Sequence, residues 1–172
     1  MGDTGLWIAG LTGVTAVLAS WVTSLGHTRA ARLQAEITAA TQEETRRREV
    51  RRAAYLAFLE QAHLTGVEYR QTPAILGVED DQRRRDGIDE HRARLREVFG
   101  PFRHTYQVAT VHAVSAGTAV ACDRVFAASR EVYMALGDIA DGVRDASAFH
   151  VALHGYWTAV DELGRAVRHE DP

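Results

Sequence analysis

The stretch LWIAGLTGVTAVLASWVTSL, Leu6–Leu25, runs for about twenty residues without a formal charge. A helix of that length covers about 30 Å at ~1.5 Å per residue, which matches the hydrocarbon core of a bilayer. No later part of the chain resembles it, because charged residues interrupt every later apolar run. The stretch therefore predicts a single transmembrane helix that anchors the rest of the chain.

Residues that flank the stretch give the predicted anchor a direction. Trp7 and Trp21 lie near its two ends, where indole rings favour the membrane–water interface. Asp3 precedes it, whereas Arg29 and Arg32 follow it. Positive charge beside a membrane span marks the cytoplasmic side. We therefore expect a single-pass protein of the inner or plasma membrane, with its N-terminus outside and its C-terminal domain in the cytoplasm.

Two other interpretations of Leu6–Leu25 explain less. A cleaved secretory signal has a basic N-terminal region and a small-residue cleavage site after its apolar run, and the sequence shows neither. A buried core helix is the other alternative. That helix would be apolar on all sides, which is uncommon for the N-terminal helix of a small domain.

Small residues recur along one face of the predicted anchor, at spacings of three and four residues. They are Gly5, Ala9, Gly13, Ala16 and Ser20. Such a small-residue stripe lets the backbones of two membrane helices approach closely, so it favours self-association. The alternative is that these residue types are common in any such helix, which leaves tethering as the only role.

Composition favours helix for the remainder of the chain. The 172 residues are 46% hydrophobic and 25% charged, and they include only three prolines. We expect a transmembrane anchor in residues 1–27, a charged helical stalk in residues 28–54 and a cytoplasmic helical bundle in residues 55–172. The predicted fold class is all-α, in which the anchor continues into a long stalk helix and an up-and-down bundle follows.

The predicted stalk is polar and contains no helix breaker. Its modest apolar seam consists of Leu33, Ile37 and Ala40, which is too short for a stable coiled coil. Its densest basic run consists of Arg46, Arg47, Arg48, Arg51 and Arg52. Glu43 and Glu44 precede this run in the order that favours ion pairs on a helix surface. We expect a solvated, ion-paired face; contact with anionic lipid or nucleic acid is the alternative.

Four apolar stripes at the spacing of core-facing helices occupy residues 55–69, 88–106, 120–139 and 149–167. Leu56 belongs to the first of them and Val120 to the third. Short polar segments separate the stripes, as in an up-and-down bundle.

Turn signals mark the ends of these helices. Pro73 disfavours helical geometry in the residue before it, so residues 72–81 are expected to form a loop. Asp80 or Asp81 is expected to cap the next helix, and Pro101 to kink or break it. Ser115 or Thr118 is expected to begin the helix after that.

Motifs for catalysis are missing from the sequence. All basic residues are Arg, which excludes a Walker-type phosphate loop and a Schiff-base lysine. The lone Cys122 excludes an intrachain disulfide. A net charge of −3 gives no reason to expect nucleic acid. We predict no enzymatic activity and no cofactor.

His150 and His154 are the weak candidates for a metal site, because residues four apart share one side of a helix. Asp161 on the same helix, or Glu60 and His63 on a facing one, would have to complete the site. The motif lacks the glutamate of His-Glu-x-x-His, so a metal-dependent hydrolase is only a second alternative.

Three segments together carry a family resemblance: WIAGLTGVTAVLASW at residues 7–21, TRAARLQAEI at 28–37 and RRREVRRAAYLAFLEQAH at 46–63. They resemble the small single-pass membrane proteins of GC-rich actinobacteria. The resemblance implies an N-terminal anchor and a helical cytoplasmic domain, and it transfers no activity and no functional residue.

These features together predict a non-enzymatic, membrane-anchored helical module for interaction or oligomerisation. Its expected partners are the lipid bilayer and either further copies of the chain or another protein, and no nucleic acid. The first alternative is an oligomerising effector or toxin that disrupts membranes, because the predicted anchor is rich in Thr, Ser and Gly.

Overall fold

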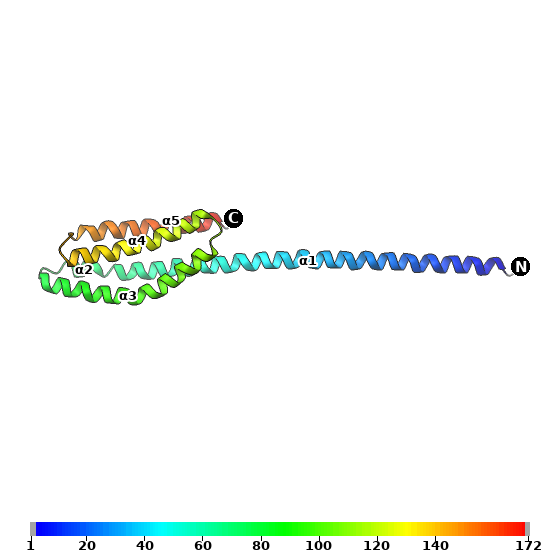
Figure 1. Ribbon diagram of the computed structural model, residues 1–172, viewed down its shortest axis with the longest axis horizontal. Helices are drawn as coiled ribbons and strands as arrows, with labels where there is room; N and C mark the ends of the chain where they lie inside the picture. The colour runs from blue at the N-terminus through cyan, green and yellow to red at the C-terminus, as the bar shows by residue number, and fades with distance from the viewer. Residues whose placement is uncertain (1–2, 171–172) are drawn as a thin grey trace. The chain divides into compact units, whose positions relative to one another are not determined.

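The computed structural model describes residues 3–170, and the side chains of residues 32–169. Its helices are α1 (Asp3–Tyr69), α2 (Thr72–Leu76), α3 (Asp81–His112), α4 (Ala116–Ala140) and α5 (Ser147–Glu170) (Figure 1). None of the described residues lies in a strand. The prediction of an all-α fold is therefore confirmed.

The chain divides into two compact units, Met1–Arg48 and Glu49–Pro172. The second unit contains the C-terminal part of α1 together with α2–α5. In this unit the end of α1, α3, α4 and α5 run up and down in turn (Figure 1). The unit begins at Glu49, whereas the sequence placed the start of the bundle at Tyr55.

The predicted anchor Leu6–Leu25 lies in α1, which is continuous from Asp3 to Tyr69, but its side chains are outside the described residues. The same holds for the small-residue stripe and the two flanking tryptophans, namely Gly5, Ala9, Gly13, Ala16, Ser20, Trp7 and Trp21. Among the residues that the structure describes, no helix has the length and apolarity needed to cross a membrane. The anchor stays a prediction.

Side-chain caps begin α3 and α4 where the sequence predicted. Asp80 Oδ1 accepts a hydrogen bond from the backbone N–H of Arg83 at 2.7 Å. Ser115 Oγ accepts one from the N–H of Thr118 at 3.0 Å. Each cap satisfies one of the N–H groups that the first turn of a helix leaves unpaired.

The two internal prolines act differently from each other. Residues 72–81 were expected to form a loop, but they include α2, because Pro73 lies in its first turn, where no backbone N–H is needed. Pro101 lies inside α3, which continues through it. Figure 1 shows that α3 bends along its length, so the expected kink is present and the alternative of a break is not.

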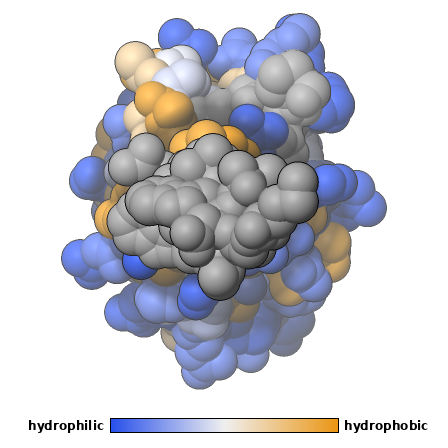
Figure 2. Space-filling model, turned by 90° about the vertical axis from the view of Figure 1, so that its right-hand side faces the viewer, coloured by the Kyte–Doolittle hydropathy of each residue, from blue (hydrophilic) through white to orange (hydrophobic). Residues whose placement is uncertain are grey.

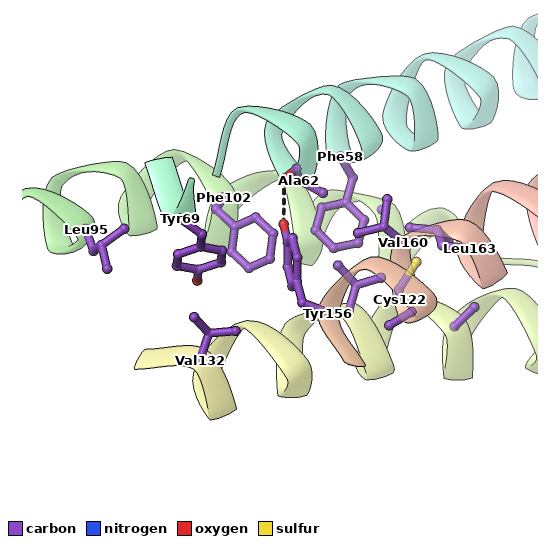
Figure 3. Close-up of a cluster of buried hydrophobic side chains, with 14 of the residues drawn as sticks. Phe58, Ala62, Tyr69, Leu95, Phe102, Cys122, Val132, Tyr156, Val160 and Leu163 are labelled. Atoms are coloured by element: carbon purple, nitrogen blue, oxygen red, sulfur yellow. Dashed lines mark hydrogen bonds between the residues drawn. The ribbon is translucent and has the colours of Figure 1, made fainter. Parts of the chain in front are cut away.

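Aromatic side chains from three helices fill the core of the second unit. Phe58 of α1, Phe102 of α3, and Phe149 and Tyr156 of α5 are fully buried. The Tyr156 hydroxyl donates a hydrogen bond to the carbonyl oxygen of Ala62 at 2.5 Å (Figure 3). A buried tyrosine needs such an acceptor, so this bond fixes the level of α5 against α1.

Two residues assigned to the core by their spacing are exposed. The side chain of Leu56 is 53% exposed and that of Val120 is 48% exposed. Thr118, Ala121 and Cys122 are buried at the start of α4 instead. The other members of these two stripes, such as Phe58 in α1 and Val125 in α4, are buried as expected, so the error is confined to the edge of each buried face.

A polar pair lies buried between α2 and α3. Thr72 Oγ1 and His91 Nε2 are 3.0 Å apart, and both side chains are fully buried. Burial lowers the pKa of His91, the positive charge of Arg94 lowers it further, and Glu68 partly offsets this. The neutral imidazole therefore belongs to the folded state.

We expect acid to weaken the fold through His91. The pKa of His91 in the folded state lies below its ordinary value of 6.5, so the unfolded chain binds the proton more readily. The free energy of unfolding should be unaffected by this group above pH 6.5, and should fall as the pH falls from there toward the lowered pKa. Chemical denaturation of the full chain at a series of pH values measures it.

His91→Gln should flatten this part of the pH profile, since glutamine does not titrate. His104→Gln, at an exposed position of the same helix, is the matched control and should keep the profile of the unchanged chain. If the free energy of unfolding of His91→Gln fell with pH as steeply as that of the unchanged chain, other groups would be the cause of the acid sensitivity.

We expect Gly66→Ala to destabilise the second unit by about 1–3 kcal/mol, the usual cost of overpacking a core. A Cβ atom at Gly66 would lie 2.4 Å from Cζ2 of Trp157. Gly155→Ala is the control, because a Cβ there meets nothing within 4 Å. It should instead stabilise α5 by about 0.5–1 kcal/mol through helix propensity. Equal effects of the two substitutions on the denaturation midpoint would contradict the close contact.

Candidate functional site

The strongest candidate site is a cavity of about 360 Å³ between α1, α3 and α4. Helix α1 contributes Thr65 and Tyr69, α3 contributes Leu95, Arg96 and Phe99, and α4 contributes Ser129, Arg130, Tyr133 and Met134. Its volume is within the range of small-molecule sites, toward the lower end.

One wall of the cavity carries a buried pair of hydroxyl groups. Tyr69 Oη and Ser129 Oγ are 2.9 Å apart, and the Tyr69 hydroxyl also donates to the Ser129 carbonyl at 3.3 Å. Burial raises the pKa of Tyr69 to about 12, although the bond to Ser129 opposes this. The phenol is therefore neutral at physiological pH and unsuited to act as a base.

The hydroxyl of Thr65, which also lines the cavity, has a hydrogen-bond partner too. Thr65 Oγ1 donates to the carbonyl oxygen of Gln61, one turn earlier in α1, at 2.9 Å. Leu95, Phe99 and Met134 contribute only apolar atoms. The cavity therefore offers a ligand an almost entirely apolar wall.

Tyr133 is held at the cavity by an arginine behind it. The guanidinium carbon of Arg92 lies 4.6 Å from the centre of the Tyr133 ring, a cation–π contact. Gly137 leaves room for this arginine, because a Cβ there would lie 3.1 Å from Nη2 of Arg92. Arg92 Nε is buried and makes no hydrogen bond among the described residues. Arg92 Nη1 lies 3.8 Å from Asp89 Oδ1, an ion pair too long for a hydrogen bond, so the ring contact is the closer restraint on Arg92.

Two arginines stand at the opening of the cavity. Arg96 and Arg130 line it and are exposed to solvent, as is Met134. Neither guanidinium forms an ion pair or a hydrogen bond with a described residue. Both charged residues of the lining are thus basic, and they come from facing helices.

The candidate metal ligands do not come together. His150 and His154 are exposed on α5, and no three His, Cys, Asp or Glu side chains in residues 32–169 are placed to hold a metal ion. His63 donates from Nδ1 to the Leu59 carbonyl at 2.8 Å. Glu60 and Asp161 are exposed. The alternative of a metal-dependent hydrolase gains no support from this arrangement.

A second depression lies between α4 and α5 and is wide and shallow. His154 is part of its lining, together with Arg124 and Glu162, which form an ion pair at 2.9 Å. Small residues such as Ala152 and Gly155 form much of its floor. Its other charged residues are Arg144, which pairs with Asp138 at 3.3 Å, and Glu131, so the depression carries charges of both signs and shows no preference for a charged ligand.

The other residues singled out in the sequence, Cys122 and the basic run, have contacts that belong to the fold. Cys122 is fully buried in the core, where it packs as a small apolar residue. In the basic run, Arg47 pairs with Glu43 at 2.9 Å and Arg48 with Glu44 at 3.2 Å. The expected ion pairs are therefore confirmed. Arg46 and Arg52 are exposed, and Arg51 is half-buried.

Sequence reasoning missed the cavity and most of its lining. One signal was present: Ser129 falls at helical spacing between Val125 and Val132, which are core residues of α4. A polar residue in such a series needs a partner inside the core. Periodicity alone could not identify Tyr69 as that partner.

Comparison of the chain with protein-family models, with curated proteins and with solved structures gives no match. No residue role is therefore transferred from a relative. The function is therefore argued from the cavity, from the exposed side chains of the second unit and from the amino-acid sequence.

We expect Tyr69→Phe to lower the free energy of unfolding by about 0.5–1.5 kcal/mol, because it removes a buried hydrogen bond. Tyr133→Phe is the control, since both rings line the cavity but the Tyr133 hydroxyl has no described bond. Its effect should stay within about 0.5 kcal/mol. Chemical denaturation of both variants checks this, and equal losses would mean that the hydroxyl pair does not stabilise the wall.

Proposed function

We propose that the chain is a non-enzymatic helical module that is anchored in the inner or plasma membrane and self-associates there, or binds a protein partner. The observation that carries the proposal is Leu6–Leu25, a stretch of helical length without a charge. The basic residues after it favour an orientation with the second unit in the cytoplasm. The lipid bilayer is then one partner, and no feature calls for nucleic acid.

The small-residue stripe supports self-association within the membrane. Gly5, Ala9, Gly13, Ala16 and Ser20 follow the spacing that lets two helices approach closely. An anchor that only tethered the chain to the membrane would need to be apolar, but it would not need small residues along one face. Association through this face would make the anchor an assembly element as well as a tether.

Exposed apolar side chains in the second unit support a protein contact as well. Leu64 and Val67 of α1 are about half exposed, at 51% and 50%, and Leu56 lies two turns before Leu64 on the same side of the helix. Figure 2 shows a mostly hydrophilic face in which hydrophobic residues form small separate patches. A row of exposed large apolar residues along one side of a helix supports an interaction site there.

We expect the full chain to form dimers or larger oligomers in nanodiscs or mild detergent. Gly13→Leu should weaken this association about ten-fold or more, because a large side chain separates the two helices. Thr15→Leu is the matched control, since Thr15 is not three or four residues from any member of the stripe and the substitution should leave association unchanged. Cross-linking and sedimentation of the full chain measure both effects.

Two variants distinguish the small-residue stripe from the exposed apolar row of α1. One is a chain that starts at Arg29, and the other is Leu64→Glu in the full chain. Loss of association only in the shortened chain would assign assembly to the anchor, and loss only in Leu64→Glu would assign it to α1 of the second unit. A full chain that stays monomeric in membranes and captures no partner would overturn the proposal.

A further inference from the structure

We propose that the cavity between α1, α3 and α4 binds a small amphipathic anion, with its apolar body inside the cavity and its single anionic head against Arg96 and Arg130. The head is a carboxylate or a phosphate. This is independent of the anchor and of self-association, since every residue involved lies in the second unit.

The interior of the cavity selects an apolar body. Its hydroxyl pair, Tyr69 with Ser129, is already satisfied internally, and so is Thr65. Apart from the Tyr133 hydroxyl, the lining offers a polar ligand group no hydroxyl without a described bond, so such a group would lose more bonds to water than it gains. An alkyl or aryl group would instead remove the apolar walls from water, which is favourable.

The opening of the cavity selects a negative charge. Arg96 from α3 and Arg130 from α4 both line it, both are exposed, and neither has an ionic partner among the described residues. The acidic neighbours of these arginines are turned elsewhere: Glu97 does not line the cavity, and Glu131 lines the groove between α4 and α5. Two guanidinium groups suit a carboxylate or phosphate head, to which each can donate two hydrogen bonds.

The cavity walls are fixed before any ligand arrives. The hydroxyl pair ties α1 to α4, and the Arg92–Tyr133 contact ties α3 to α4. These two ties join all three of the helices that form the cavity. A preformed site costs little ordering on binding, so a small ligand can bind measurably.

The test uses the full chain with its methionine methyl groups labelled with carbon-13. Met134 lines the cavity, and the other methionine is Met1, so the Met134 methyl signal reports on this site specifically. Four ligands share an eight-carbon chain: octanoate, octyl phosphate, octanol and octyltrimethylammonium. We expect saturable shifts of the Met134 signal with octanoate, octyl phosphate or both, at lower concentrations than with octanol, and the weakest binding with octyltrimethylammonium.

Substitutions assign the anionic head to its arginines. Arg96→Gln and Arg130→Gln should each weaken binding of the anionic ligand about five-fold, as expected for a partly exposed ion pair, and leave octanol binding unchanged. Arg103→Gln is the matched control, because Arg103 is exposed on α3 two turns from Arg96 and does not line the cavity. It should leave both ligands unaffected.

Three results would overturn the proposal. No saturable shift of Met134 with any ligand would mean that the cavity is not a binding site. Equal affinity for octanoate, octyl phosphate and octanol, unaffected by either arginine substitution, would leave an apolar site without selection for charge. If Arg103→Gln weakened binding of the anionic ligand as much as Arg96→Gln and Arg130→Gln do, the effect would come from the net charge of the chain and not from the two arginines of the cavity.

Discussion

The second unit depends on how two aromatic side chains of α5 reach α1. Tyr156 is fully buried and donates its hydroxyl to the Ala62 carbonyl, and Trp157 occupies the space that Gly66 leaves open. The Trp157 contact requires a glycine at position 66, one turn after Ala62 on α1. Because a buried hydroxyl without an acceptor is costly, Tyr156 admits little sliding of α5 along α1. The level of one helix against the other is thereby set.

That constraint also explains where the cavity lies. The ring of Tyr156 meets the ring of Tyr69 edge to face, with their centres 5.3 Å apart, so Tyr69 is fixed from the side of α5. Its hydroxyl then reaches Ser129 on α4. The ring of Tyr69 thus has the aromatic core on one side and the cavity on the other. The cavity lies on that second side, between α1, α3 and α4.

The sequence was sufficient for the long helices and for the caps of α3 and α4, because these depend on near neighbours, but it did not predict the short α2. Asp80 and Ser115 cap α3 and α4 through groups three residues away, and the ion pairs of the stalk join residues four apart. The rotation of each helix depends on distant partners, which is why Leu56 and Val120 were wrongly placed in the core. Tyr69 and Ser129 are sixty residues apart, and periodicity carries no information about such a pair.

The buried polar residues show the same limit. His91 falls three residues after Ile88 and four before Leu95, both of which are core residues, so its position on the buried face was visible in the sequence. Its partner Thr72 was not, because it belongs to a short helix in a segment that proline made look like a loop. A buried polar residue can be located by spacing, but its partner comes from the packing of the fold.

The absence of lysine bears on the cavity in a limited way. Since every basic residue of the chain is Arg, the presence of arginine instead of lysine at the opening has the same compositional cause as elsewhere. Composition does not explain why both charged residues of the lining are basic, nor why their acidic neighbours Glu97 and Glu131 are absent from it. Successive residues on a helix point about 100° apart, so the rotation of α3 and α4 decides which charge the cavity receives. The tyrosine contacts that fix these helices therefore also fix the sign of the charge at the opening.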